Sequence, residues 1–269
     1  LILAATAHGD KGFIARGVSP EDCKSIYPGS SRDQYTHSIH GLWRYYRSPM
    51  SSKAEKEQIR RIFSDVADKM TREIRADANP PYSFKFYKGM PDDRGVGKML
   101  EVYPHEAARL SMFYAAAYDV TKKSEYFELY RKHLPYAIEH TAELPKMSER
   151  KMRGMVPAYS ILQMEASLEV LYVVEKNKKY KQQLGELMDM LADFVEKCPV
   201  FDLEKRKSSR DRSEVINGQL LSPNYKLSEK HEKILRECIA RIGGNGDCGG
   251  AYTVLAAYWR ARLEGYLKP

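Results

Sequence analysis

The segment 31–37 carries the residue types best suited to acid and base chemistry. Asp33 and His37 are four residues apart at the start of a predicted helix, so they share one helical face. A carboxylate in a first turn can act as a general acid or base when burial and a neighbouring Arg32 tune its pKa. We therefore predict that Asp33 is catalytic and that Arg32, Gln34 and His37 bind substrate.

Helix capping is the simpler interpretation of the same segment. Ser31 or Asp33 would then accept backbone N–H groups, and the charge of Asp33 would favour the helix dipole. The number of polar groups favours chemistry, because Arg16 and Asp22 precede the segment in a long polar stretch. We add Arg16 to the predicted substrate-binding residues.

Three further places hold candidate residues. His105 lies at the start of the next predicted hairpin, where it could reach the same site. Arg94, beside Asp93, lies at the tip of a predicted β-hairpin, although a turn explains those residue types equally well. Asp247 stands in a glycine-rich stretch before the last helix and offers a second carboxylate. We predict that His105 and Arg94 bind substrate and that Asp247 is catalytic, with Asp93 as an alternative partner.

Two carboxylates on opposite sides of a sugar are what glycosidic hydrolysis requires. Tyrosine and Trp43 can stack on sugar faces, but most of the 19 tyrosines lie at predicted helix-packing positions. The sequence has no nucleophile elbow, dinucleotide fingerprint, phosphate-binding loop or nucleic-acid motif. The four cysteines have no zinc-ligand spacing. We expect no cofactor and no metal.

Amphipathic segments with helical spacing of apolar residues must position these side chains. They form pairs joined by short turns: 33–47 with 53–75, 105–121 with 124–141, and 158–175 with 179–197. Ser228 caps a later helix that ends at Gly243, and a last helix covers about 251–266. Tyr118 and Tyr126 recur as Tyr172 and Tyr180, an offset of 54 residues, which supports a repeating helical hairpin.

The connections between pairs are long, whereas the turns within pairs are short. The long connections are predicted at 10–32, 77–104, 143–157 and 198–226, and the basic run 205–212 is interpreted as a solvated loop. Because antiparallel helices place alternate connections at opposite ends, the long loops should share one face. Alternation of apolar residues around 82–87 and 96–102 predicts a β-hairpin within the second connection.

These features predict an all-α fold, a closed (α/α) toroid of helical hairpins with a small β-hairpin insertion. Small residues such as Ala115–Ala117 suit inner helices that are buried on most sides. We expect a single domain over 1–269. Leu1–Ala5 reads as the tail of a helix, so we expect a truncated N-terminus with a helix or signal peptide upstream.

Composition limits the possible partners. The chain of 269 residues has no apolar run long enough for a membrane helix, so no membrane span is expected. Its net charge of +8 is spread over helical faces, and no nucleic acid partner is expected.

The motifs in the first 50 residues resemble the six-hairpin glycosidase superfamily. They are Gly12–Gly17, Ser31–Thr36 and Gly41–Tyr46. The resemblance implies a carbohydrate-active enzyme of (α/α) toroid form with Asp33 as the carboxylate at an inner-helix start. It also implies a polysaccharide or oligosaccharide substrate and an exported bacterial protein, periplasmic, on the cell surface or secreted.

The function expected is therefore a glycoside hydrolase, acting on a glycan that could contain uronic acid. Two alternatives stay open. One is a helical-repeat scaffold or glycan-binding protein without catalysis. The other is a polysaccharide lyase, in which a His and a Tyr transfer protons while an Arg neutralises a carboxylate.

Overall fold

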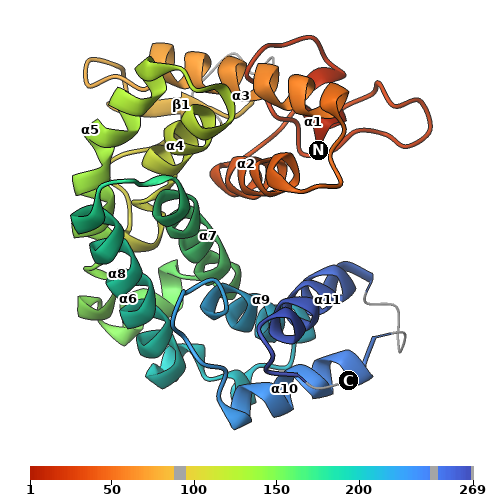
Figure 1. Cartoon of the computed structure of the whole chain (residues 1–269), viewed down its shortest axis with the longest axis vertical. Coiled ribbons are helices and arrows are strands. Elements are labelled where there is room, and N and C mark those ends of the chain that lie inside the picture. Colours follow the sequence, from red (N-terminus) through yellow and green to blue (C-terminus); the bar gives the residue numbers. More distant parts are fainter. Residues whose placement is uncertain (88–94, 243–247, 268–269) are drawn as a thin grey trace. The chain divides into compact units, whose positions relative to one another are not determined.

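The computed structural model describes residues 1–87, 95–242 and 248–267 (Figure 1). This part of the chain is mostly helical and contains one short pair of strands, which confirms the predicted all-α class. None of its helices combines the length and the apolar character needed to cross a membrane. The chain folds as two compact units, Leu1–Ala137 and Ile138–Pro269.

The first unit contains two of the predicted helical pairs and the predicted β-hairpin. Its helices are α1 (Ile2–Thr6), α2 (Arg32–Arg47), α3 (Lys53–Glu73), α4 (Arg109–Thr121) and most of α5 (Ser124–Thr141). Its strands are β1 (Ser83–Lys85) and β2 (Val96–Lys98), which pair antiparallel. The helix expected from His105 begins instead at Arg109, after a 3-10 turn over Pro104–Glu106, because Pro104 fits the first position of such a turn.

Helix α2 runs parallel to α4, and α3 also packs against α4. Asp33 and Arg109 pair at the starts of α2 and α4, while Trp43 and Asp119 pair at their ends. Most of α4 is buried, from Arg109 to Ala117. A serine cap and a capping box between Ser52 and Glu55 fix the start of α3.

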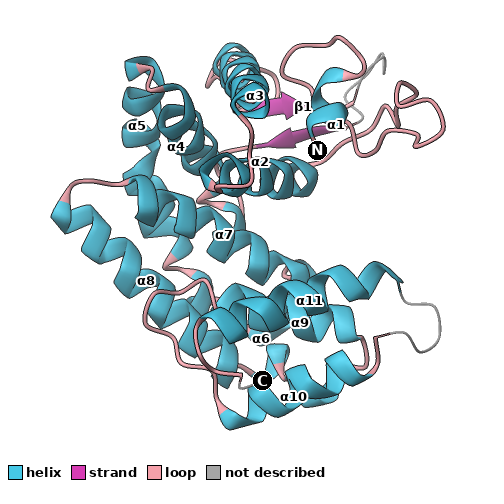
Figure 2. Cartoon of the chain, turned by 45° about the vertical axis from the view of Figure 1, so that its right-hand side comes forward, coloured by secondary structure: helices cyan, strands magenta, loops and turns pink. Residues whose placement is uncertain are grey.

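Tyr35 joins three segments of this unit. Its hydroxyl donates to the carbonyl of Gly12 at 2.9 Å and accepts from the backbone N–H of Ile14 at 3.1 Å. Its ring meets the rings of Phe84 and Phe86 edge to face, with centroids 5.3 and 5.5 Å apart. The β-hairpin therefore packs against α2, and it also contacts α3 (Figure 2).

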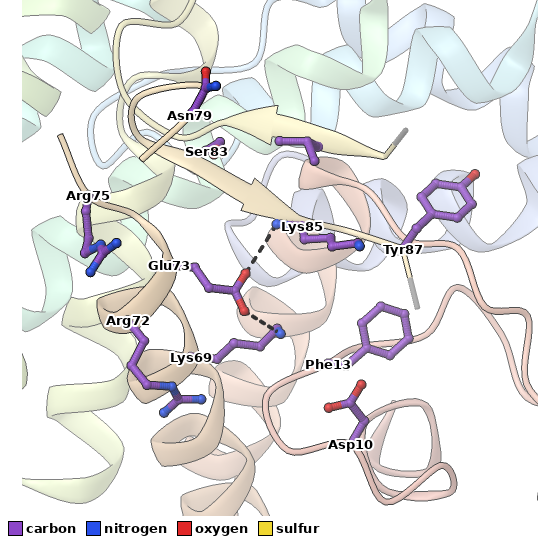
Figure 3. A pocket seen from close by; sticks show the side chains of 11 residues that line it. Asp10, Phe13, Lys69, Arg72, Glu73, Arg75, Asn79, Ser83, Lys85 and Tyr87 are labelled. Atoms are coloured by element: carbon purple, nitrogen blue, oxygen red, sulfur yellow. Dashed lines mark hydrogen bonds and ion pairs between the residues drawn. The ribbon is translucent and has the colours of Figure 1, made fainter. Parts of the chain in front are cut away.

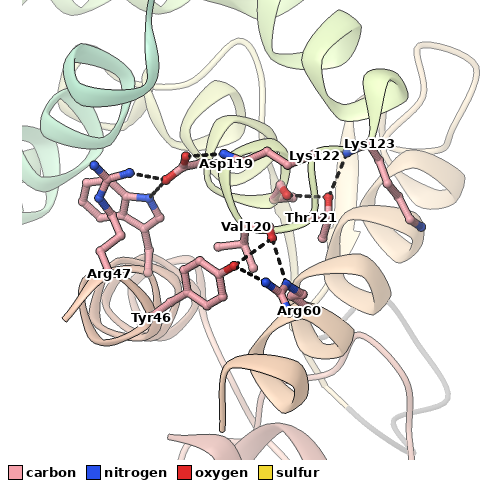
Figure 4. A network of polar contacts seen from close by, with 10 residues as sticks. Tyr46, Arg47, Arg60, Asp119, Val120, Thr121, Lys122 and Lys123 are labelled. Carbon is pink, nitrogen blue, oxygen red and sulfur yellow. Dashed lines mark hydrogen bonds and ion pairs between the residues drawn. The ribbon is translucent and has the colours of Figure 1, made fainter. Parts of the chain in front are cut away.

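A polar cluster joins the C-terminal ends of α2 and α4 (Figure 4). Trp43 Nε1 donates to Asp119 Oδ2 at 2.9 Å, Arg47 pairs with the same oxygen, and Lys122 donates to Oδ1 at 2.9 Å. We call these four residues the Asp119 cluster. Burial raises the pKa of Asp119, but the hydrogen bonds from Lys122, Trp43 and Arg47 outweigh it, so the net pKa is lowered. Asp119 is held as a carboxylate.

The second unit also consists of helical hairpins. Its helices are α6 (Glu149–Met155), α7 (Ala158–Val174), α8 (Lys178–Lys197), α9 (Ser209–Gln219), α10 (Glu229–Ala240) and α11 (Cys248–Leu263). Helix α7 contacts α8 and α9, and α9 contacts α10 and α11. Ser228 caps α10 as predicted.

The predicted long loops over 143–157 and 198–226 are wrong, because they contain α6 and α9. The basic run 205–212 enters this helix at Ser209, with Ser208 as its cap. No apolar stripe marks α9: its buried face includes Ser213, Glu214 and Asn217. A helix that buries polar side chains lacks the periodicity by which helices are recognised.

Glu165 is fully buried in the middle of α7. Neither of its carboxyl oxygens has a hydrogen-bond partner among the described residues. Burial raises the pKa of Glu165 well above its usual value, and the charges of Asp189 and Glu169 raise it further. The folded chain therefore favours the protonated, uncharged form of this carboxyl group.

Candidate active site around Asp33

The start of α2 separates the capping role from the possible catalytic role. Ser31 is the cap, and its hydroxyl accepts from the backbone N–H of Gln34 at 3.2 Å. Asp33 is therefore not needed as the cap. Its carboxylate instead pairs with Arg109 across the α2–α4 contact, with Oδ1 2.9 Å from Nη2.

Arg109 is the buried cation of this site, with only 2% of its side chain exposed. Its Nη1 also lies 3.2 Å from Glu106 Oε1. Burial lowers the pKa of Arg109, and the charges of Glu106 and Asp33 oppose that shift. A guanidinium stays protonated in proteins, so burying it requires this carboxylate pairing.

Arg32 extends the network from α2 to the β-hairpin. Its Nη1 lies 3.0 Å from Glu106 Oε2 and donates to the carbonyl of Lys98 at 3.2 Å. Arg32, Asp33, Glu106 and Arg109 form what we call the Arg109 cluster. Of its two carboxylates, Glu106 is 8% exposed and Asp33 is 34% exposed. Asp33 is the carboxylate that a substrate could reach.

His105 and Tyr103 lie beside this cluster. The rings of His105 and Tyr103 are stacked, with centroids 6.0 Å apart and an interplanar angle of 9°. His105 is buried, and its Nδ1 has no hydrogen-bond partner within the described ranges. Burial, followed by the charges of Arg109 and Arg32, lowers its pKa to about 3. His105 is thus a neutral imidazole near pH 7, while Tyr103 presents a partly exposed ring.

The structure brings together three of the predicted site residues, Arg32, Asp33 and His105. Arg16 is exposed, and its guanidinium lies 5.6 Å from the ring centroid of Tyr27. Gln34 is half-buried and His37 is exposed, both on α2. The other two predicted residues, Arg94 and Asp247, lie outside the described residues, as does Asp93.

Glu106 and Arg109 are the members of the cluster that the sequence prediction left out. Glu106 lies just before α4 and Arg109 is its first residue, while Leu110 to Ala117 carry no charge. Charged side chains at the entrance to a buried helix require partners, and this was the available signal.

In comparisons with known proteins, no protein family, curated protein or solved structure matches the chain. Among the described residues, no group of three or more His, Cys, Asp or Glu side chains is arranged to hold a metal ion. The chemistry of the site therefore has to be argued from the Arg109 cluster and the rings beside it.

Proposed function

We propose that this chain is a carbohydrate-active enzyme, a glycoside hydrolase in which Asp33 is a catalytic carboxylate. The observation that carries the proposal is the Asp33 carboxylate itself, one-third exposed and fixed by a buried Arg109. A positioned carboxylate can accept a proton from a water molecule or a sugar hydroxyl, provided that it is held in one geometry. Arg109 supplies that constraint.

The surroundings of Asp33 suit a sugar. Tyr103 is 37% exposed and its ring is backed by the neutral ring of His105, so it can offer a flat face for the C–H groups of a sugar ring. Arg32 is partly exposed and can hydrogen-bond hydroxyl or carboxylate groups. Hydrolysis needs a second carboxylate, and the two residues predicted for that role, Asp247 and Asp93, lie outside the described residues.

The architecture proposed is an (α/α) toroid. Within each unit, the first helices of successive hairpins contact one another: α2 with α4 in the first unit, and α7 with α9 and α9 with α11 in the second. Contacts of this kind support an inner layer of helices with the second helices outside it. Asp33 lies at the start of such an inner helix.

The test is a screen of purified protein on neutral and uronic acid-containing glycans, with analysis of the products. We expect cleavage of at least one glycan, and a loss of about 100-fold or more in kcat for Asp33→Asn, the usual cost of removing an acid or base. Asp211→Asn, a matched change at a partly exposed position in α9, should keep full turnover. Full turnover by Asp33→Asn would exclude the mechanism, and products that absorb as unsaturated uronides would show a lyase.

A non-catalytic glycan-binding or scaffold protein is the second candidate. It is favoured by the pairing within the Arg109 cluster, because every charged group there has an ion-pair partner, as in a purely structural network. Glycan binding without product formation, unchanged in Asp33→Asn, would establish this candidate.

A further inference from the structure

A cavity of about 530 Å³ lies in the first unit between the end of α3, the β1–β2 hairpin and the segment 10–13 (Figure 3). None of the residues that line it belongs to the Arg109 cluster. Its volume is in the range of small-molecule sites, about 300–1,000 Å³. This unit therefore has a second place that could hold a ligand.

Positive charge predominates on the cavity wall. Among the described residues that line it, four are cationic and two are carboxylates: Lys69, Arg72, Arg75 and Lys85 against Asp10 and Glu73. Glu73 is already used, because it pairs with Lys69 at 2.6 Å and accepts the backbone N–H of Lys85 at 3.4 Å (Figure 3). An anionic ligand would meet more positive than negative charge here.

The two arginines are the cations best placed to bind an anion. Arg72 makes no ion pair within the part of the chain that the structure describes. Arg75 pairs with Asp77 at 3.3 Å, but both side chains are more than half exposed, so the pair is weak. Compensation of the helix dipole would explain Arg72 in the last turn of α3, but not Arg75 beyond the helix end. Guanidinium groups match the planar oxygens of carboxylates and the oxygens of sulfates.

The remaining lining suits a hydroxylated ring. Asp10 and Asn79 can accept hydrogen bonds from hydroxyl groups, and Phe13 and Tyr87 contribute aromatic rings. A small inorganic anion would use the arginines alone. A sugar ring that carries an acidic group would use the arginines, the acceptors and the rings together.

We propose that this cavity is a binding site for an acidic sugar residue. Its carboxylate or sulfate would meet Arg72 and Arg75, and its hydroxyl groups would meet Asp10 and Asn79. The choice of a sugar rests on the proposed function, whereas the preference for an anion rests on the cavity alone.

The test measures binding of four probes to the full chain by calorimetry or ligand-observed NMR: glucuronate, glucose 6-sulfate, glucose and inorganic sulfate. At least one acidic sugar should bind about tenfold or more tightly than glucose and than inorganic sulfate. The double variant Arg72→Ala and Arg75→Ala should weaken that binding by about tenfold or more, since tenfold corresponds to about 1.4 kcal/mol and charge-assisted hydrogen bonds exceed this. Both side chains are exposed, so the variant should keep the unfolding temperature of the wild type.

Two controls locate the site. Arg61→Ala removes an equal charge from another position on α3, where Arg61 is 74% exposed, and should leave binding unchanged. Asp33→Asn should also leave it unchanged.

Equal binding of glucose and glucuronate, inorganic sulfate binding as tightly as the acidic sugars, or binding unaffected by the double variant would overturn the proposal. Loss of binding in Asp33→Asn would place the ligand at the Arg109 cluster instead. Full turnover by Asp33→Asn would defeat the catalytic proposal and leave this one standing.

Discussion

The two ends of the α2–α4 pair carry polar clusters of opposite construction. In the Arg109 cluster the cation is buried, with 2% of its side chain exposed, and the Asp33 carboxylate is 34% exposed. In the Asp119 cluster the carboxylate is 13% exposed, while Arg47 and Lys122 are 44% and 68% exposed. Both clusters connect the same two helices. The buried group that joins the two helices is a cation at one end and a carboxylate at the other, and its sign decides whether the more exposed partner is a carboxylate or a cation.

The comparison predicts that the largest loss of stability follows from removing the buried cation. Arg109→Met leaves Asp33 and Glu106 close together without their shared partner, and should lower the free energy of unfolding by about 3–5 kcal/mol. Urea unfolding followed by circular dichroism measures this. A loss below about 1 kcal/mol would mean that Arg109 does not stabilise the contact between α2 and α4.

A smaller loss is expected at the other end. Asp119→Ala leaves the indole N–H of Trp43 without its acceptor and should lower the free energy of unfolding by about 1–3 kcal/mol. Lys122→Gln, which removes only an exposed partner of Asp119, should change it by less than about 1 kcal/mol. Equal losses in the two variants would contradict the view that the buried carboxylate of Asp119 provides most of the stabilisation in this cluster. Neither change should affect turnover of a glycan.

A third prediction distinguishes the two clusters by the pH at which each loses its contribution to stability. The pKa of His105 is lowered to about 3, so the folded chain binds fewer protons than the unfolded chain between pH 3 and its usual value of 6.5. Its contribution to stability is fully present above pH 6.5 and falls as the pH drops through this window, by about 1.4 kcal/mol per pH unit. The contribution of Asp119, whose pKa is also lowered, is lost only below 3.8.

His105→Gln should therefore flatten the dependence of stability on pH between 4 and 6.5, relative to the wild type. Lys122→Gln provides the control, because its slope in this window should match that of the wild type. An unchanged slope in His105→Gln would show that the imidazole titrates normally in the folded chain.

The sequence predicts those helices that have an apolar stripe and a recognisable start. The apolar stripe from Ile59 to Met70 predicts a helix over 53–75, and the structure confirms it as α3. Helix α9 could not be predicted from apolar spacing, because polar side chains such as Ser213 and Asn217 occupy its buried face. Those side chains are stabilised by partners far along the chain: Thr253 for Ser213, and Arg260 for Asn217.

The candidate site was predictable only in part, for the same reason. Asp33 and Arg32 were identified from their position at a helix start, and His105 from the equivalent position one hairpin later. The pairing that joins them runs through Arg109, which is 76 residues from Asp33 along the chain. Local spacing contains no information about such a contact. A charged pair at the entrance of an apolar helix indicates that a partner exists, but not which residue it is.

The buried carboxyl of Glu165 releases a proton when the chain unfolds. Its pKa is raised in the folded chain and returns to about 4.5 when the chain unfolds, so the group ionises on unfolding at any pH between these two values. This term favours the folded state least at the upper end of that range. Between pH 4.5 and 6.5 the imidazole of His105 takes up a proton on unfolding and offsets this release. Where the buffer takes up the proton instead, the calorimetric heat of unfolding includes the buffer's own enthalpy of protonation.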